Sequence, residues 1–127
     1  MTAAFSRRCA VVPELAFALA LTLAAPVLAH PKLVSASPAA DAPSPPTARL
    51  DLSFSEAMVP AMTSVTLAHM MGQMAHPIAG TLRFASDNRS LALVLARPLP
   101  AGTYSVAWKS VGADTHKVSG NYQFTIR

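Results

Sequence analysis

The chain has 127 residues, of which 52% are hydrophobic and 13% charged, and its formal net charge is +4 at pH 7. The hydrophobic excess is concentrated near the N-terminus, where residues 15–29 carry no charge and follow Arg7 and Arg8. This length and composition exclude a multidomain enzyme and indicate one small domain behind an N-terminal segment of a different kind.

The N-terminal segment, residues 1–29, is predicted to be a secretory signal peptide. A basic start, an apolar run, and the small residues Val27 and Ala29 at the −3 and −1 positions are typical of such a signal. The run is shorter than the ~20 apolar residues of a membrane-spanning helix, and no stop-transfer charges follow it. We therefore expect cleavage after Ala29, a mature domain of residues 30–127, and no stable membrane insertion. The pair Arg7-Arg8 leaves twin-arginine export open as the less favoured route.

The only cysteine, Cys9, lies in the segment that we expect to be removed. The mature domain therefore has no disulfide, no thiolate metal site and no thiol nucleophile, and it depends on its core for stability. Its basic residues are scattered singly along the chain, which argues against a nucleic-acid partner.

Alternation of apolar and polar residues predicts a domain built from strands. The clearest runs, followed by the shorter candidates, are 47–54, 90–96, 103–111 and 121–126, then 32–36, 63–68 and 78–84. Turn-forming segments rich in proline, glycine, aspartate or asparagine separate them at 38–46, 87–89 and 98–102. About seven short strands with such turns predict an all-β fold, a single small antiparallel β-sandwich or barrel with almost no helix.

His30 becomes the N-terminal residue if cleavage follows Ala29. Its α-amine and imidazole Nδ1 can then close a six-membered chelate ring around a metal. An ordinary α-amine has a pKa of about 8, so a metal displaces its proton at low cost at neutral pH. Nitrogen donors of this kind suit Cu(II). Pro31 has no backbone N–H to deprotonate, so further ligands must come from elsewhere in the fold. Taken alone, His30 is more simply explained as the residue where cleavage falls.

Asp114-Thr115-His116 lies in a polar segment between the last two predicted strands. A spacing of two on an extended segment places both side chains on one side, so carboxylate and imidazole can reach one ion. A solvated surface loop is the simpler explanation of such a pair by itself. An N-terminal histidine in an exported domain without cysteine favours the metal site.

Residues 69–77 concentrate methionine and histidine in the sequence His-Met-Met-Gly-Gln-Met-Ala-His-Pro. Methionine usually fills gaps in a core, but the glycine, glutamine and proline in this run indicate an exposed loop. Thioethers with imidazoles form a soft donor set that suits Cu(I). The candidate ligands are His69, Met70, Met71, Met74 and His76. Met58 and Met62 lie upstream, and their assignment to core or site stays open.

Residues 30–127 resemble the CopC family of periplasmic copper-resistance proteins. The shared residues occur in family order, namely His30-Pro31-x-Leu33, Ser35-x-Ser37-Pro38-Ala39-x-Asp41, Leu52-x-Phe54-Ser55-Glu56, Leu99-x-x-Gly102-Thr103-Tyr104-x-Val106-x-Trp108, Ser110, Asp114-x-His116-x-Val118-x-Gly120 and Phe124. The resemblance implies a Greek-key fold of cupredoxin-like or immunoglobulin-like type that carries copper and is not an enzyme.

The resemblance also implies ligands and partners. In the family, Cu(II) is bound by the mature N-terminal histidine, an Asp-x-His pair and sometimes a glutamate, which correspond here to His30, Asp114, His116 and Glu56. Some members bind Cu(I) in a methionine-rich loop, which corresponds to residues 69–76. The implied protein is a periplasmic carrier or buffer, expected to be a monomer, whose partners are copper ions, an inner-membrane copper-import protein and a multicopper oxidase.

Three alternatives stay open. A single Cu(II) site serving copper import would leave residues 69–76 without a copper role. An N-terminal histidine with a second histidine also resembles the histidine brace of copper-dependent polysaccharide monooxygenases. Against such an enzyme, Trp108 and both tyrosines are expected to face the core, and Asp114 would occupy a position that oxygen needs. A structural adhesive β-domain would explain the strands but not the clustered histidines and methionines.

Overall fold

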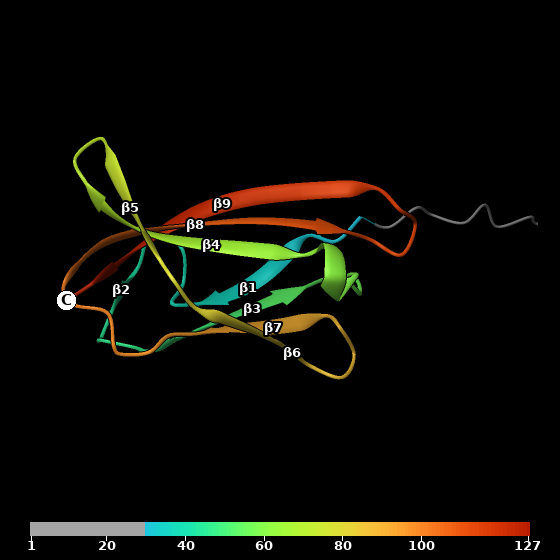
Figure 1. Ribbon diagram of the computed structural model, residues 1–127, viewed down its shortest axis with the longest axis horizontal. Helices are drawn as coiled ribbons and strands as arrows, with labels where there is room; N and C mark the ends of the chain where they lie inside the picture. The colour runs from blue at the N-terminus through green and yellow to red at the C-terminus, as the bar shows by residue number, and fades with distance from the viewer. Residues whose placement is uncertain (1–29) are drawn as a thin grey trace, which may run out of the picture.

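The structure is a computed structural model that describes residues 30–127, so the expected signal peptide and Cys9 lie outside the described residues. The described chain forms nine strands and one short 3-10 turn (Figure 1). Their bounds are β1 Leu33–Ser37, β2 Pro43–Ser44, β3 Arg49–Phe54, η1 Pro60–Met62, β4 Ser64–Met71, β5 Met74–Ile78, β6 Thr81–Phe84, β7 Ser90–Val94, β8 Gly102–Val111 and β9 Lys117–Ile126. Within these residues, no helix is long and apolar enough to span a membrane.

The strands form two sheets that lie one above the other (Figure 1). One sheet has the order β1-β3-β7-β6 and the other has the order β2-β9-β8-β4-β5. Every pairing between named strands is antiparallel except that of β2 with β9, which is parallel. The predicted all-β sandwich is therefore confirmed.

Residues 69–71, 74–77 and 117–120 belong to strands β4, β5 and β9, although the predicted strands did not include them. Two further differences concern the run 78–84 and the connector 38–46. The run 78–84, predicted as one strand, is divided between β5 and β6, because the chain passes there from one sheet to the other. Gly80 lies at this crossing, where a Cβ atom would stand only 2.7 Å from Leu93 Cδ1. The second difference is β2, which lies inside the proline-rich connector 38–46 and is only two residues long. It pairs in parallel with the end of β9, and a strand of this length is too short to show alternation in the sequence.

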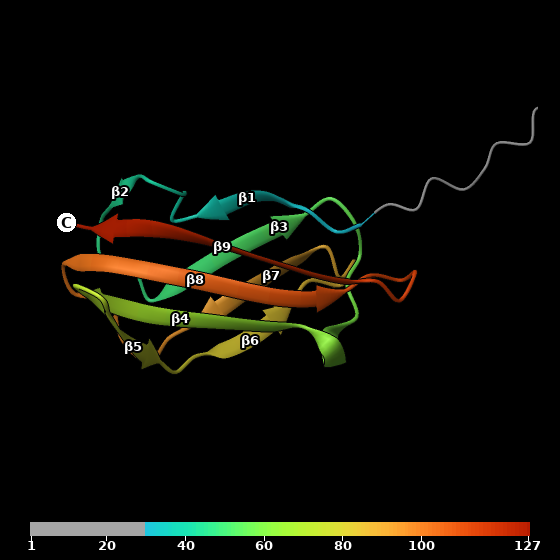
Figure 2. The same ribbon diagram turned by 90° about the horizontal axis from the view of Figure 1, so that it is seen from above.

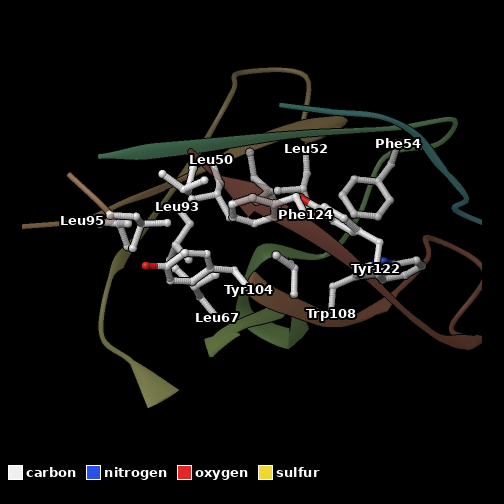
Figure 3. Packing of buried hydrophobic residues seen from close by; sticks show 14 of the residues in the cluster. Leu50, Leu52, Phe54, Leu67, Leu93, Leu95, Tyr104, Trp108, Tyr122 and Phe124 are labelled. Atoms are coloured by element: carbon white, nitrogen blue, oxygen red, sulfur yellow. The ribbon is translucent and has the colours of Figure 1, made fainter. Parts of the chain in front are cut away.

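The core lies between the sheets and contains the apolar side of each long strand (Figure 3). Phe54 on β3 meets Trp108 on β8 edge to face, with ring centroids 4.9 Å apart. Trp108, Tyr104 and Tyr122 are 7%, 0% and 9% exposed. The prediction that these three aromatic residues face inward is confirmed, and they offer no flat aromatic surface to a polysaccharide.

The fold places the two candidate sites at opposite ends of the sandwich (Figures 1 and 2). The segment that begins at His30 lies beside the connection between β8 and β9. The hairpin of β4 and β5 projects at the other end, near the C-terminus. The two sets of candidate ligands therefore cannot share one ion.

Candidate metal sites

Asp114 and His116 lie in the tight connection between β8 and β9. The Thr115 N–H donates to the carbonyl of Gly112 (3.0 Å), and the Gly112 N–H donates to the carbonyl of His116 (3.1 Å). Thr115 has a φ of +70°, in the left-handed region that β-branched residues rarely adopt. The expected extended segment is therefore wrong. A closed turn, rather than strand alternation, brings the carboxylate and the imidazole together.

The Asp114 carboxylate holds the His116 side chain in place. Its Oδ1 accepts the His116 N–H (3.1 Å), and its Oδ2 lies 2.9 Å from His116 Nδ1. The backbone hydrogen bond from His116 is the main cause that lowers the pKa of Asp114; partial burial opposes it, and the imidazoles of His116 and His30 add to it. The carboxylate is therefore ionised at neutral pH. Because it engages Nδ1, Nε2 is the nitrogen of His116 that is left available to a metal ion.

His30 completes this cluster, which we call the N-terminal site (His30, Asp114 and His116). The rings of His30 and His116 have centroids 4.8 Å apart and planes inclined by 53°. One ligand atom from each of the three residues lies within 4.8 Å of the other two. His30 is exposed, but the next residue, Pro31, is fully buried and fixes the start of the domain. This packing role of Pro31 was not predicted from the sequence, where only its missing N–H carried information.

Glu56 lies outside the N-terminal site. It occupies the bend after β3 and is half-buried, and the cluster of carboxylate and imidazole groups found within residues 30–127 does not include it. Its neighbour Ser55 donates its N–H to the Lys32 carbonyl (2.9 Å) and accepts the Lys32 N–H on Oγ (3.0 Å). Glu56 therefore follows a residue that contacts the segment leading into β1, but it does not join the cluster of His30, Asp114 and His116.

Residues 69–76 form a β-hairpin, which we call the methionine hairpin, so the expectation of a loop between two strands is wrong. Its strands are the end of β4 and the start of β5, and a two-residue turn at Gly72-Gln73 joins them. Gly72 has a φ of +63°, a conformation that glycine adopts at no steric cost. Met71 and Met74 flank the turn and are 59% and 65% exposed, so the expected exposure of the segment is correct.

The register of the hairpin separates its donors into two faces. Met71 pairs with Met74, and His69 pairs with His76. Since successive side chains of a strand alternate, these four residues share one face, whereas Met70 points to the other. On β4 these side chains lie on the same face as buried Leu67, so the shared face extends the core-facing side of β4 beyond the core. Four of the five predicted Cu(I) ligands are therefore brought to one side of the hairpin, and Met70 is separated from them.

His69 is held against β8. Its ring stacks on the Tyr104 ring with centroids 4.9 Å apart and an interplanar angle of 24°. Its Nε2 lies over Gly102, where a Cβ atom would approach to 2.5 Å. His69 and His76 line one open groove of about 650 Å³ at the base of the hairpin, together with Pro98 and other residues. The imidazoles therefore lie at the base of the hairpin and the thioethers at its tip.

The two upstream methionines differ. Met58 is 3% exposed and belongs to the core, whereas Met62 on η1 is 57% exposed. Neither lies on the methionine hairpin, which is at the other end of the sandwich (Figure 1).

Comparison with known proteins shows which family this chain resembles in sequence. The CopC domain family model matches residues 33–127. Copper resistance protein C of Escherichia coli is 35% identical over 114 residues, which cover 86% of this chain and 90% of that protein. Its counterpart from Pseudomonas syringae pv. tomato is 34% identical over 115 residues, covering 87% and 91%.

Solved structures of copper resistance and CopC proteins are similar to this chain as well. The crystal structure of PcoC, a methionine-rich copper resistance protein from Escherichia coli, matches with a TM-score of 0.71 and 36% identity, covering 78% of this chain and 100% of that chain. The structure of CopC from Methylosinus trichosporium matches with a TM-score of 0.68 and 26% identity, covering 76% and 93%.

Proposed function

The chain belongs to the CopC family, and we propose that it is a periplasmic copper-binding protein that carries or buffers copper in copper resistance and homeostasis. The convergence of His30, Asp114 and His116 at one end of the sandwich is the observation that carries this proposal. Relatives of about 35% identity that are named for copper resistance support the choice of metal.

At the N-terminal site we propose binding of Cu(II). Cleavage after Ala29 would free the His30 α-amine, and the amine and imidazole of His30 with the imidazole of His116 give the nitrogen donors that Cu(II) favours. Asp114 adds a negative charge. Each of its oxygens keeps a lone pair beyond the hydrogen bond to His116, so the carboxylate can bind the ion and orient the imidazole together.

At the methionine hairpin we propose binding of Cu(I). The donors are Met71 and Met74 at the tip with His76 and His69 at the base, since these four share a face. Thioether and neutral imidazole are soft or borderline donors that need no charge to bind Cu(I). The pairing of Met70 with Ala75 on the other face argues against Met70 as a ligand in the same coordination sphere.

The distance between the sites gives the protein two independent copper positions. Hard nitrogen and oxygen donors stabilise Cu(II), whereas thioethers stabilise Cu(I). An external reductant or oxidant that changes the oxidation state of the bound copper would weaken its binding at the site that holds it, so the ion would pass to the other site or to another molecule. In the periplasm the monomer would exchange copper with an inner-membrane copper-import protein and a multicopper oxidase.

A histidine-brace oxygenase is the second candidate, because the His30 and His116 rings lie only 4.8 Å apart. Two observations favour a carrier instead. The ionised carboxylate of Asp114 lies within the cluster of ligands, where it would compete with oxygen for the ion. The three large aromatic residues that could bind a polysaccharide are buried. Copper-loaded protein that consumes oxygen in the presence of ascorbate faster than free copper would support the enzyme.

Copper stoichiometry, measured separately for each oxidation state on the processed protein, tests the proposal directly. We expect one equivalent of Cu(II) and one equivalent of Cu(I), bound without competition between them. A protein that binds Cu(II) but no Cu(I) would be a single-site Cu(II) protein, in which residues 69–76 have no copper role. A protein that binds neither ion would refute the proposed function.

A further inference from the structure

Gly112 stands where the segments of the N-terminal site meet. It follows the end of β8, and its backbone forms a β-bridge with Met58 in the connection after β3. Its N–H donates to the His116 carbonyl, and its carbonyl accepts the Thr115 N–H. One residue thus joins β8, the turn that carries Asp114 and His116, and the buried Met58.

The space around Gly112 is filled by the two segments that carry the ligands. A Cβ atom at this position would lie 2.9 Å from Asp114 Oδ1, 3.0 Å from Pro31 Cδ and 3.4 Å from Pro31 Cγ. Pro31 is fully buried, and Asp114 is fixed by its two hydrogen bonds to His116. Neither neighbour can move aside without displacing a ligand of the site.

The backbone of Gly112 does not itself demand glycine. Its φ lies outside the left-handed region, unlike that of Gly72 or Gly102, so an alanine could adopt the same conformation. The requirement for glycine at position 112 is therefore one of space. That space is what allows Pro31 and Asp114 to pack against the same backbone atoms.

We propose that Gly112 is a positioning residue of the N-terminal site, because its missing side chain sets the separation between His30 and the pair Asp114 and His116. Pro31 transmits this contact to His30, which directly precedes it. The inference rests on the proposed Cu(II) function for the identity of the ion. Changes in residues that orient metal ligands typically weaken metal binding by about 10- to 100-fold.

The test compares two glycine-to-alanine variants of the processed protein. Gly112→Ala is expected to fold, to lose about 10- to 100-fold in Cu(II) affinity, and to change the Cu(II) electron paramagnetic resonance spectrum while Cu(I) affinity stays the same. Gly80→Ala is the matched control, since its Cβ would lie 2.7 Å from Leu93 in the core. The control is expected to lower the melting temperature and leave the Cu(II) affinity and spectrum unchanged.

Several results would overturn the inference. Wild-type Cu(II) affinity and spectrum in Gly112→Ala would show that the added methyl group does not reach the ligands. An equal loss in Gly80→Ala would mean that general loosening of the fold is the cause. Failure of Gly112→Ala to fold while Gly80→Ala folds would assign Gly112 to the core.

A measurement without any variant tests the contact itself. Apoprotein NMR should show a nuclear Overhauser effect between the Pro31 δ protons and the Gly112 α protons, and its absence would contradict the geometry. The proposed function fails separately, since it would be refuted by wild-type protein that binds no Cu(II).

Discussion

The imidazole rings of His30 and His116 lie with centroids 4.8 Å apart, although His30 begins the described chain and His116 lies in its last hairpin. The fold brings them together because the segment that begins at His30 and leads into β1 lies beside the β8–β9 turn (Figure 2). The Asp114 carboxylate holds the His116 ring, so this imidazole loses little further conformational entropy when an ion binds. The α-amine of His30 becomes free only after cleavage behind Ala29. It is therefore the one proposed donor that depends on processing and not on folding alone.

Processing should therefore control Cu(II) binding. A protein that retains one extra residue before His30 has an amide in place of the basic amine, and an amide nitrogen binds Cu(II) poorly until it is deprotonated. We expect the extended protein to lose more than about tenfold in Cu(II) affinity, or about 1.4 kcal/mol, as measured by competition with a chelator. Cu(I) affinity serves as the internal control and should not change. Equal Cu(II) affinities of the two proteins would remove the amine from the ligand set.

His116→Ala should abolish tight Cu(II) binding and leave Cu(I) binding intact, because the methionine hairpin lies at the other end of the sandwich. Asp114→Asn should weaken Cu(II) binding less, since the amide oxygen remains a donor but carries no charge. Titration of each variant with Cu(II) and Cu(I) measures both effects. Loss of Cu(I) with retention of Cu(II) in His116→Ala would reverse the assignment of the two sites.

Asp114 should also make the stability of the apoprotein depend on pH. The His116 amide that donates to this carboxylate lowers its pKa in the folded state. A lowered pKa stabilises the folded protein above the unfolded pKa of about 3.9, and the contribution disappears as the pH falls through the lower folded value. The free energies of unfolding of wild type and Asp114→Asn should therefore differ at neutral pH and converge in acid. A difference that is constant with pH would show that the hydrogen bonds to the carboxylate do not stabilise the fold.

The predicted strands agree with the structure wherever one face is buried and the other is exposed. The strands that contain Leu52, Trp108 and Phe124 alternate clearly and were predicted, although the last of them begins at Lys117 and not at residue 121. Alternation carries no information where a strand crosses between sheets, as at Gly80, or has only two residues, as in β2. Local pattern therefore predicts a strand, and long-range packing decides where it is divided.

The site shows the same division between local and long-range information. Donor chemistry and spacing made His30, Asp114 and His116 candidates, and the resemblance to the CopC family grouped them into one site. The turn that joins Asp114 to His116 could not be predicted, because it depends on a left-handed Thr115 that no sequence rule favours. The packing of Pro31 against Gly112 joins residues from the two ends of the domain, so only the folded structure reveals it.

Replacing Met70, Met71 and Met74 together with leucine tests the methionine hairpin as a whole. Such swaps usually cost under about 1.5 kcal/mol even inside a core, and Met71 and Met74 are largely exposed. The triple variant should therefore keep nearly the same melting temperature, lose Cu(I) binding because leucine has no lone pair, and retain Cu(II) binding. If methionine only fills space here, Cu(I) affinity will be unchanged and any effect will be confined to the melting temperature.

The single variants test the two faces of the methionine hairpin. Met70 is paired with Ala75 on the face away from the histidines, whereas Met71 and Met74 share the face of His76. Met70→Leu should therefore leave Cu(I) affinity within about twofold of wild type, and Met71→Leu or Met74→Leu should each lower it by more than about tenfold, or 1.4 kcal/mol. X-ray absorption of the Cu(I) form supplies a second measurement, because a sulfur shell in a mature chain without cysteine requires thioether ligands. That shell should persist in Met70→Leu and shrink in Met71→Leu. Equal losses in all three variants would mean that the turn rearranges on binding and that the two faces do not select the ligands.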